Sequence, residues 1–217
     1  MNKEVNKLEY QIPFSQKEYV QALIRSHFRE ADLPECLKIE GELSLSNLMA
    51  RAWYRPEQDG KILTVMSLGR IFDDLIESYE KKEELLLAYA AECLAMEVLK
   101  KAYEMFGRML YEKEGKYPET YHFLNDKEMR NMPEILEQMG IREICCNEAF
   151  ALVPQKTVVF LTELSDRANK ECAKPCVNCS RKNCPNRTKE TEQNPAALNY
   201  GYQRIFGSGG KQEWKKD

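Results

Sequence analysis

Residues 61–69 read KILTVMSLG and residues 85–106 read LLLAYAAECLAMEVLKKAYEMF, and together these two runs decide the fold class. The first is a short apolar run ended by glycine, which predicts a buried strand over residues 61–68. In the second, apolar residues recur every three or four positions, which predicts one face of an amphipathic helix. Residues 70–112 are expected to be helical almost throughout, with a break near residues 80–83.

A second strand is predicted between Glu148 and Glu163, where β-branched and aromatic residues are frequent. Pro154 interrupts this run and indicates an edge, a bulge or a crossover. Between the two strands, a helix is expected from Asp126 to Gln138, ended by Gly140. Strands and long helices without regular βαβ alternation predict an α+β fold, with residues 61–68 and 149–162 in the same sheet.

The sequence as a whole divides into four expected regions. Ser15 is a suitable N-cap for a helix over residues 15–31, so residues 1–36 are expected to form an N-terminal helical segment. Extended or irregular structure is expected from Leu37 to Tyr54, at the start of an α+β core over residues 37–165. Residues 166–187 form a Cys-rich segment. Residues 188–217 are polar and contain Gly-Ser-Gly-Gly, which predicts a flexible tail.

Composition limits the functional class. A chain of 217 residues fits one domain with a small appendage, and 43% apolar content is enough for a proper core. A net charge of −3 gives no basic surface for nucleic acid. No apolar run approaches ~18 residues, so no membrane span is expected. The first residues lack the apolar run of a signal peptide, so a cytoplasmic location with reduced thiols is expected.

Four of the eight cysteines lie close together, at Cys172, Cys176, Cys179 and Cys184. Thiolates are soft ligands, and a set of four selects zinc or an iron–sulfur cluster over hard cations. Structural zinc sites usually separate two pairs of cysteines by a longer loop, which this run lacks. Pro185 directly follows the last cysteine, as in bacterial ferredoxin runs. An iron–sulfur (4Fe–4S) cluster is therefore favoured, with zinc as the alternative and redox-active or incidental thiols as the third possibility.

One segment resembles a known family. Asn147-Glu-Ala-Phe-Ala-Leu-Val-Pro-Gln-Lys-Thr-Val-Val159 is similar to the signature Thr-Glu-Ser-Phe-Ala-Met-x-Pro-x-x-Ser-Val-Ser of the activation domain of cobalamin-dependent methionine synthase, which binds S-adenosylmethionine (AdoMet). Upstream, Lys116-Tyr-Pro-Glu-Thr-Tyr121 aligns with the family's Arg-x-x-x-Gly-Tyr, and Asp126 with an acidic position that follows it. The ending Asn-Cys-Pro-x-Arg is similar to stand-alone clostridial relatives of this domain. The resemblance covers residues 60–187.

The resemblance implies a methionine synthase activation-domain-like fold, with an antiparallel sheet flanked by long helices and an AdoMet groove at its surface. It implies an AdoMet site formed by Lys116, Tyr121, Asp126, Pro154 and Thr157. Lys116 would neutralise the AdoMet carboxylate, Tyr121 would contact the ligand, and Asp126 would attract its sulfonium or amino group. The protein would act on a partner, a corrinoid (cobalamin) protein whose cobalt has reached the inactive Co(II) state.

The function expected from these features is that of an accessory protein in cobalamin-dependent methyl transfer, rather than a free-standing catalyst. An iron–sulfur cluster would relay the electron from a donor to the cobalt. The alternative is a metal-stapled binding module that kept the fold, lost AdoMet binding, and docks on a corrinoid protein or another partner. Lys116 and Thr120 replace the family's Arg and Gly, and these replacements are the basis of that alternative.

Overall fold

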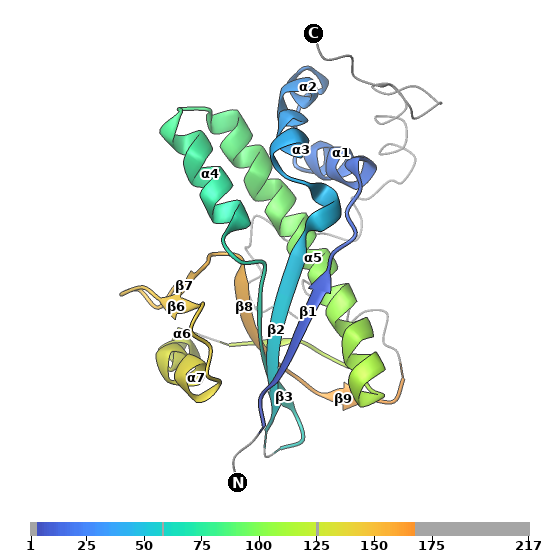
Figure 1. Cartoon of the computed structure of the whole chain (residues 1–217), viewed down its shortest axis with the longest axis vertical. Coiled ribbons are helices and arrows are strands. Elements are labelled where there is room, and N and C mark those ends of the chain that lie inside the picture. Colours follow the sequence, from blue (N-terminus) through green and yellow to red (C-terminus); the bar gives the residue numbers. More distant parts are fainter. Residues whose placement is uncertain (1–3, 58, 125, 168–217) are drawn as a thin grey trace.

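The computed structural model describes residues 4–57, 59–124 and 126–167. Its centre is an antiparallel sheet with the strand order β1-β2-β3-β8-β5. These strands are β1 (Asn6–Gln11), β2 (Met49–Pro56), β3 (Ile62–Ser67), β8 (Thr157–Thr162) and β5 (His122–Phe123). The described chain is therefore mixed α+β, with an antiparallel sheet and a long helix, as the sequence predicts (Figure 1).

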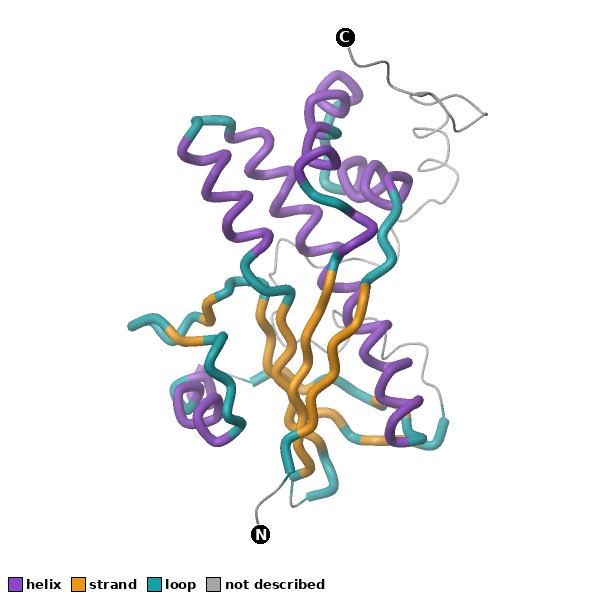
Figure 2. Tube along the Cα trace, viewed as in Figure 1, coloured by secondary structure: helices purple, strands orange, loops and turns teal. Residues whose placement is uncertain are grey.

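Helices lie on both sides of this sheet and beyond one of its ends (Figure 2). They are α1 (Gln16–Arg25), α2 (Leu33–Cys36), α3 (Lys38–Glu42), α4 (Ile71–Lys81), α5 (Leu85–Glu114), α6 (Asp126–Met129) and α7 (Met132–Gln138), with 3-10 turns η1 (Glu30–Asp32) and η2 (Leu45–Asn47). Two small sheets complete the fold, one of β4 (Tyr117–Pro118) with β9 (Leu164–Ser165), the other of β6 (Cys145–Cys146) with β7 (Leu152–Val153). Of the helices in the described ranges, none combines the length and the apolarity that crossing a bilayer requires.

Strand β3 is buried along its whole length because both faces of the sheet are covered. On one face, Met66 and Phe160 pack with the apolar stripe of α5. On the other face, Leu63 and Val65 pack with α7 and the β6–β7 hairpin. Side chains alternate between the faces of a strand, so a strand in the middle of such a layer has apolar residues at nearly every position.

Local signals place several element boundaries where the sequence predicts them. The Ser15 hydroxyl accepts a hydrogen bond from the Glu18 N–H (3.3 Å), and the Glu18 carboxylate accepts one from the Ser15 N–H (2.8 Å), so α1 begins with a capping box. Gly140 follows α7 with φ +65°, a left-handed conformation that favours glycine. The break between α4 and α5 also falls as predicted, between Lys81 and Leu85.

The N-terminal region differs from the prediction of a separate helical segment. Residues 6–11 form the edge strand β1, which pairs with β2 over its full length. The Tyr10 hydroxyl donates to the carbonyl oxygen of Ala102 in α5 (3.0 Å), and Arg25 of α1 is ion-paired with Glu97 of α5 (2.6 Å). Residues 4–36 therefore share the sheet and the core of the residues that follow them.

Three other expectations need correction. The extended structure predicted from residue 37 is wrong over Lys38–Glu42, which is helical because Ile39 and Leu43, four residues apart, are both buried on one side. Helix α1 ends at Arg25, not at residue 31. The strand predicted over 149–162 is confirmed as a member of the main sheet only for Thr157–Thr162, and Leu152–Val153 belongs to the small β6–β7 sheet.

Candidate functional site

The first part of the sequence-predicted site lies around strand β5. Lys116 is exposed in the turn between α5 and β4. Tyr121 is only 2% exposed, and its ring packs edge-on against Phe160, with centroids 4.9 Å apart. The Tyr121 hydroxyl donates to the carbonyl oxygen of Tyr103 (3.3 Å). Asp126 begins α6, and its side chain is outside the described part of the chain. Tyr121 thus holds the loop against the core.

The second part lies at the start of β8. Pro154 is buried, and the hydroxyls of Thr157 and Ser67 are 2.8 Å apart, sharing a hydrogen bond between β8 and β3. Strand β4, which follows Lys116, pairs with Ser165 beyond the other end of β8. Eight residues of extended chain span roughly 25 Å, so Lys116 and Thr157 lie near opposite ends of the strand. The structure does not bring the five predicted residues to one place.

The loop before α6 and strand β8 do meet at a pocket of about 460 Å³ between the sheet and α6–α7. Its floor is aliphatic, with Leu63 of β3, Leu161 of β8, Leu124 of the loop and Ile135 of α7. Its rim is polar and is formed by Arg55, Glu57, Asp59, Glu128 and Asn131. Pockets of about 300–1,000 Å³ that combine an apolar lining with a few polar groups are typical sites for small molecules.

Among the described residues that line this pocket, Arg55 carries the positive charge. It lies near the end of β2, and its side chain is 15% exposed. Its Nε donates to the Glu57 carboxylate (2.9 Å) and its Nη2 to the side-chain oxygen of Gln138 (3.1 Å). These bonds use two of the five N–H groups of a guanidinium and fix its plane. A guanidinium held in this way is suited to a planar anion such as a carboxylate.

The same rim carries three carboxylates, those of Glu57, Asp59 and Glu128. The backbone N–H of Lys61 donates to Asp59 (3.2 Å), and its ammonium group lies 3.3 Å from the same carboxylate. That N–H, together with the ammonium, holds the pKa of Asp59 below its usual range. The carboxylates therefore make the rim acidic on balance at neutral pH, which suits a ligand with cationic groups in addition to a carboxylate.

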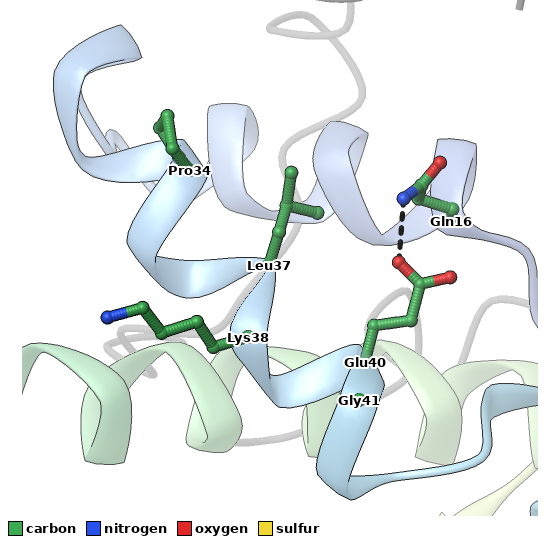
Figure 3. Close-up of a pocket in the computed structure, with 6 residues that line it drawn as sticks. All are labelled: Gln16, Pro34, Leu37, Lys38, Glu40 and Gly41. Atoms are coloured by element: carbon green, nitrogen blue, oxygen red, sulfur yellow. Dashed lines mark hydrogen bonds between the residues drawn. The ribbon is translucent and has the colours of Figure 1, made fainter. Parts of the chain in front are cut away.

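A second pocket, of about 540 Å³, lies among α1, α2 and α3 (Figure 3). The Gln16 amide donates to the Glu40 carboxylate across it (2.7 Å), and Pro34, Leu37, Lys38 and Gly41 complete the lining. The walls of this second pocket include none of the segments that resemble the family. We therefore take the pocket beside Arg55 as the candidate site.

Sequence reasoning did not identify Arg55 or Glu57 as site residues. Both belong to the run Arg55-Pro-Glu-Gln-Asp-Gly60, which reads as a charged turn. Solvated turns commonly have this composition, so the charges alone gave no signal of a binding site. The pairing of β3 with β8 brings this turn near Leu161, and that contact depends on the tertiary fold.

The four cysteines of the predicted metal site, Cys172, Cys176, Cys179 and Cys184, lie outside the described residues. In residues 4–57, 59–124 and 126–167 no group of three or more His, Cys, Asp and Glu side chains is placed to hold a metal ion. Burial raises the pKa of the Cys36 thiol to about 12 and also raises that of Cys93, so both are poor thiolate ligands. A metal centre on the four C-terminal cysteines therefore stays a prediction.

Comparison of the chain with models of known protein families, and with curated proteins, finds no match.

Proposed function

We propose that the chain is a cytoplasmic accessory protein of cobalamin-dependent methyl transfer, which binds AdoMet and assists the reductive reactivation of a corrinoid enzyme. The observation that supports this most is the pocket between the sheet and α6–α7, where the loop after β5 meets strand β8. Both segments belong to the region that resembles the activation domain of methionine synthase. The antiparallel sheet and the long Ala-rich helix agree with that resemblance.

The groups around this pocket match the chemistry of AdoMet. The ligand has one carboxylate, two cationic groups (ammonium and sulfonium) and a large, weakly polar adenosyl body. The guanidinium of Arg55 would bind the carboxylate with a two-pronged hydrogen bond. The acidic rim would attract the cationic groups, and the leucines of the floor would contact the adenosyl body.

In this proposal Arg55, and not Lys116, binds the AdoMet carboxylate. Lys116 is not among the described residues that line the pocket. Tyr121 and Thr157 keep a role in positioning. Tyr121 holds the loop against Phe160, and Thr157 fixes the start of β8 to Ser67.

The reaction requires one electron and one methyl group. The corrinoid of the partner would be the substrate: it would receive one electron from a reduced donor and the methyl group from AdoMet, which would leave as S-adenosylhomocysteine. The cobalt belongs to the partner, and this chain would bind and orient the methyl donor. A metal cluster held by Cys172, Cys176, Cys179 and Cys184 would supply an electron relay from a reduced donor.

The location of the ligand is tested by substituting Arg55. Losing a charge-assisted contact costs about 1.5–3 kcal/mol, so Arg55→Ala should weaken AdoMet binding by roughly ten- to over a hundredfold. The AdoMet affinity of Arg55→Lys should lie between those of the wild type and Arg55→Ala. An ammonium group keeps the positive charge but cannot form the two parallel hydrogen bonds of a guanidinium. Equilibrium dialysis with labelled AdoMet measures each affinity.

Two variants control this experiment. Arg51 lies on the same strand, four residues earlier, with a side chain that is 46% exposed and paired with Glu9 and Glu143. Arg51→Ala should leave the AdoMet affinity unchanged. Lys116→Ala should also have little effect. If Lys116→Ala weakens binding and Arg55→Ala does not, the ligand lies near the end of α5 and the pocket assignment is wrong.

The alternative, a metal-stapled binding module without AdoMet, is favoured by one observation. Tyr121 and Thr157 direct their hydroxyls to protein partners inside the fold. A module of this kind would bind a corrinoid protein equally well with and without AdoMet. In an AdoMet-binding accessory protein, bound AdoMet should change the affinity for the corrinoid protein, and the corrinoid protein should change the affinity for AdoMet by the same factor.

A further inference from the structure

Strand β1 forms one edge of the main sheet, and no strand of the described chain pairs with its outer side (Figure 1). The opposite edge strand, β5, has only two residues, whereas β1 has six. An edge strand of this length presents a row of main-chain N–H and C=O groups to which another strand can bond. The β1 edge is therefore the place where this sheet can be extended.

The register of β1 shows which of its main-chain groups point outward. The Ile12 N–H donates to the Leu48 carbonyl oxygen (2.7 Å), which continues the β1–β2 pairing by one residue. In an antiparallel ladder, pairs that exchange hydrogen bonds alternate with pairs that do not. Counting back from Ile12, every second residue bonds to β2. Lys7 and Glu9 lie between these residues, so their N–H and C=O groups point away from the sheet.

The side chains of β1 divide between the two faces of the sheet. Leu8 and Tyr10 are buried in the core that α5 covers. Because side chains alternate along a strand, Lys7 and Glu9 lie on the opposite face, where their side chains are 47% and 46% exposed. They carry opposite charges two positions apart. An edge with this pattern is complementary to an antiparallel copy of itself.

Two conditions select the register of such a pair. A two-fold axis at the edge makes the two strands antiparallel. Outward main-chain groups must face each other, so Lys7 and Glu9 of one copy can lie only opposite residues that also point outward. Like charges directly opposite each other are unfavourable, which excludes Lys7 opposite Lys7 and Glu9 opposite Glu9. Lys7 opposite Glu9 meets both conditions, and it places Leu8 opposite Leu8 on the core face.

We propose that this chain forms a two-fold dimer in which the β1 strands of two copies pair antiparallel, with Lys7 of each copy opposite Glu9 of the other. Main-chain hydrogen bonds then join the two sheets into one. Arg51 lies 3.3 Å from Glu9, and Glu143 lies 3.5 Å from Lys7, so each new pair continues a row of alternating charge. Charged residues on an edge strand discourage pairing with other strands, and here they favour a second copy.

Charge reversal at the edge tests this pairing. Association of the full-length, metal-loaded chain is measured by sedimentation in reducing buffer, which excludes disulfide-linked dimers. The wild type should show a reversible monomer–dimer equilibrium. Glu9→Lys brings like charges together at both symmetric pairs and should weaken dimerisation about tenfold or more, and Lys7→Glu should do the same. An equal mixture of the two variants should associate again, because each charge then meets its opposite on the other chain.

Hydrogen exchange gives a second readout. The N–H groups of Lys7 and Glu9 should exchange more slowly as the protein concentration rises, whereas the Leu8 N–H, which faces β2, should not change. Glu77→Lys is the matched control, since it makes the same charge change on α4, at a side chain that is 54% exposed. This variant should dimerise like the wild type.

Several results would overturn the proposal. The wild-type chain could sediment as a monomer at every concentration up to its solubility limit. A dimer could survive both edge substitutions, or be lost equally in Glu77→Lys. If each variant is monomeric and their mixture is too, Lys7 and Glu9 do not face each other across the axis. A dimer that is lost in Cys176→Ser but kept in Glu9→Lys would place the contact in the Cys-rich segment instead.

Discussion

Phe160→Ala is expected to lower the free energy of unfolding by about 3–5 kcal/mol, the usual cost of removing a fully buried phenyl ring. Phe160 is 0% exposed, in the middle of β8. Its ring lies 4.9–6.3 Å, centroid to centroid, from four other rings, those of Tyr103, Phe106, Tyr121 and Phe123. These rings come from α5 and from the β5 segment, so the substitution would loosen the contacts that join the long helix, the loop and the sheet.

Urea unfolding followed by circular dichroism measures this effect. Leu85→Ala is a suitable control, because the Leu85 side chain is 68% exposed and its loss should change stability by less than about 0.5 kcal/mol. A cost below about 1 kcal/mol for Phe160→Ala would mean that β8 is not the central element of this core.

Cys176→Ser is expected to remove most of the bound metal. Cys176 is the second cysteine of the four-thiolate set, and a serine hydroxyl is a hard, weakly acidic group that does not replace a thiolate on zinc or iron. Elemental analysis of protein purified without oxygen gives the metal content. The visible absorption spectrum of the same sample distinguishes an iron–sulfur cluster, which is coloured, from zinc.

Cys145→Ser is the matched control for this experiment. Cys145 is exposed on strand β6 and forms no disulfide, so its replacement leaves the core intact and should leave the metal content unchanged. Equal metal content in the wild type and in both variants would refute the assignment of the four C-terminal cysteines. Equal loss in both variants would place Cys145 in the metal centre.

Much of the helical and strand structure was predictable because its signals are local. β3 is a short apolar run ended by glycine, and α5 repeats its apolar residues with helical spacing. The helix over Lys38–Glu42 is ambiguous in the sequence, because Ile39 and Leu43 fit both a strand period and a helical one, and Gly41 lowers helix propensity. The alternation of Leu8, Tyr10 and Ile12, all buried, is the local signal for the edge strand β1 and its end.

The candidate site was harder to predict than the fold. Lys116 and Thr157 were grouped by resemblance, whereas the register of β8 with β3 and of β9 with β4 places them near opposite ends of one strand. Arg55 reaches the pocket only because β2 pairs with β3 and β3 with β8. No local pattern in the sequence carries that information, since strand pairing joins residues far apart in the chain.

Titration of the full-length, metal-loaded chain with AdoMet in a calorimeter is the most direct test of the proposed function. The account predicts saturable binding of one AdoMet per chain, with half-saturation below about 1 mM, within the range common for enzyme substrates. S-adenosylhomocysteine, which lacks the sulfonium charge, should bind more weakly because the acidic rim has one cation fewer to attract. If the folded wild-type chain gives no binding heat up to millimolar AdoMet at two temperatures, it is not an AdoMet-binding protein.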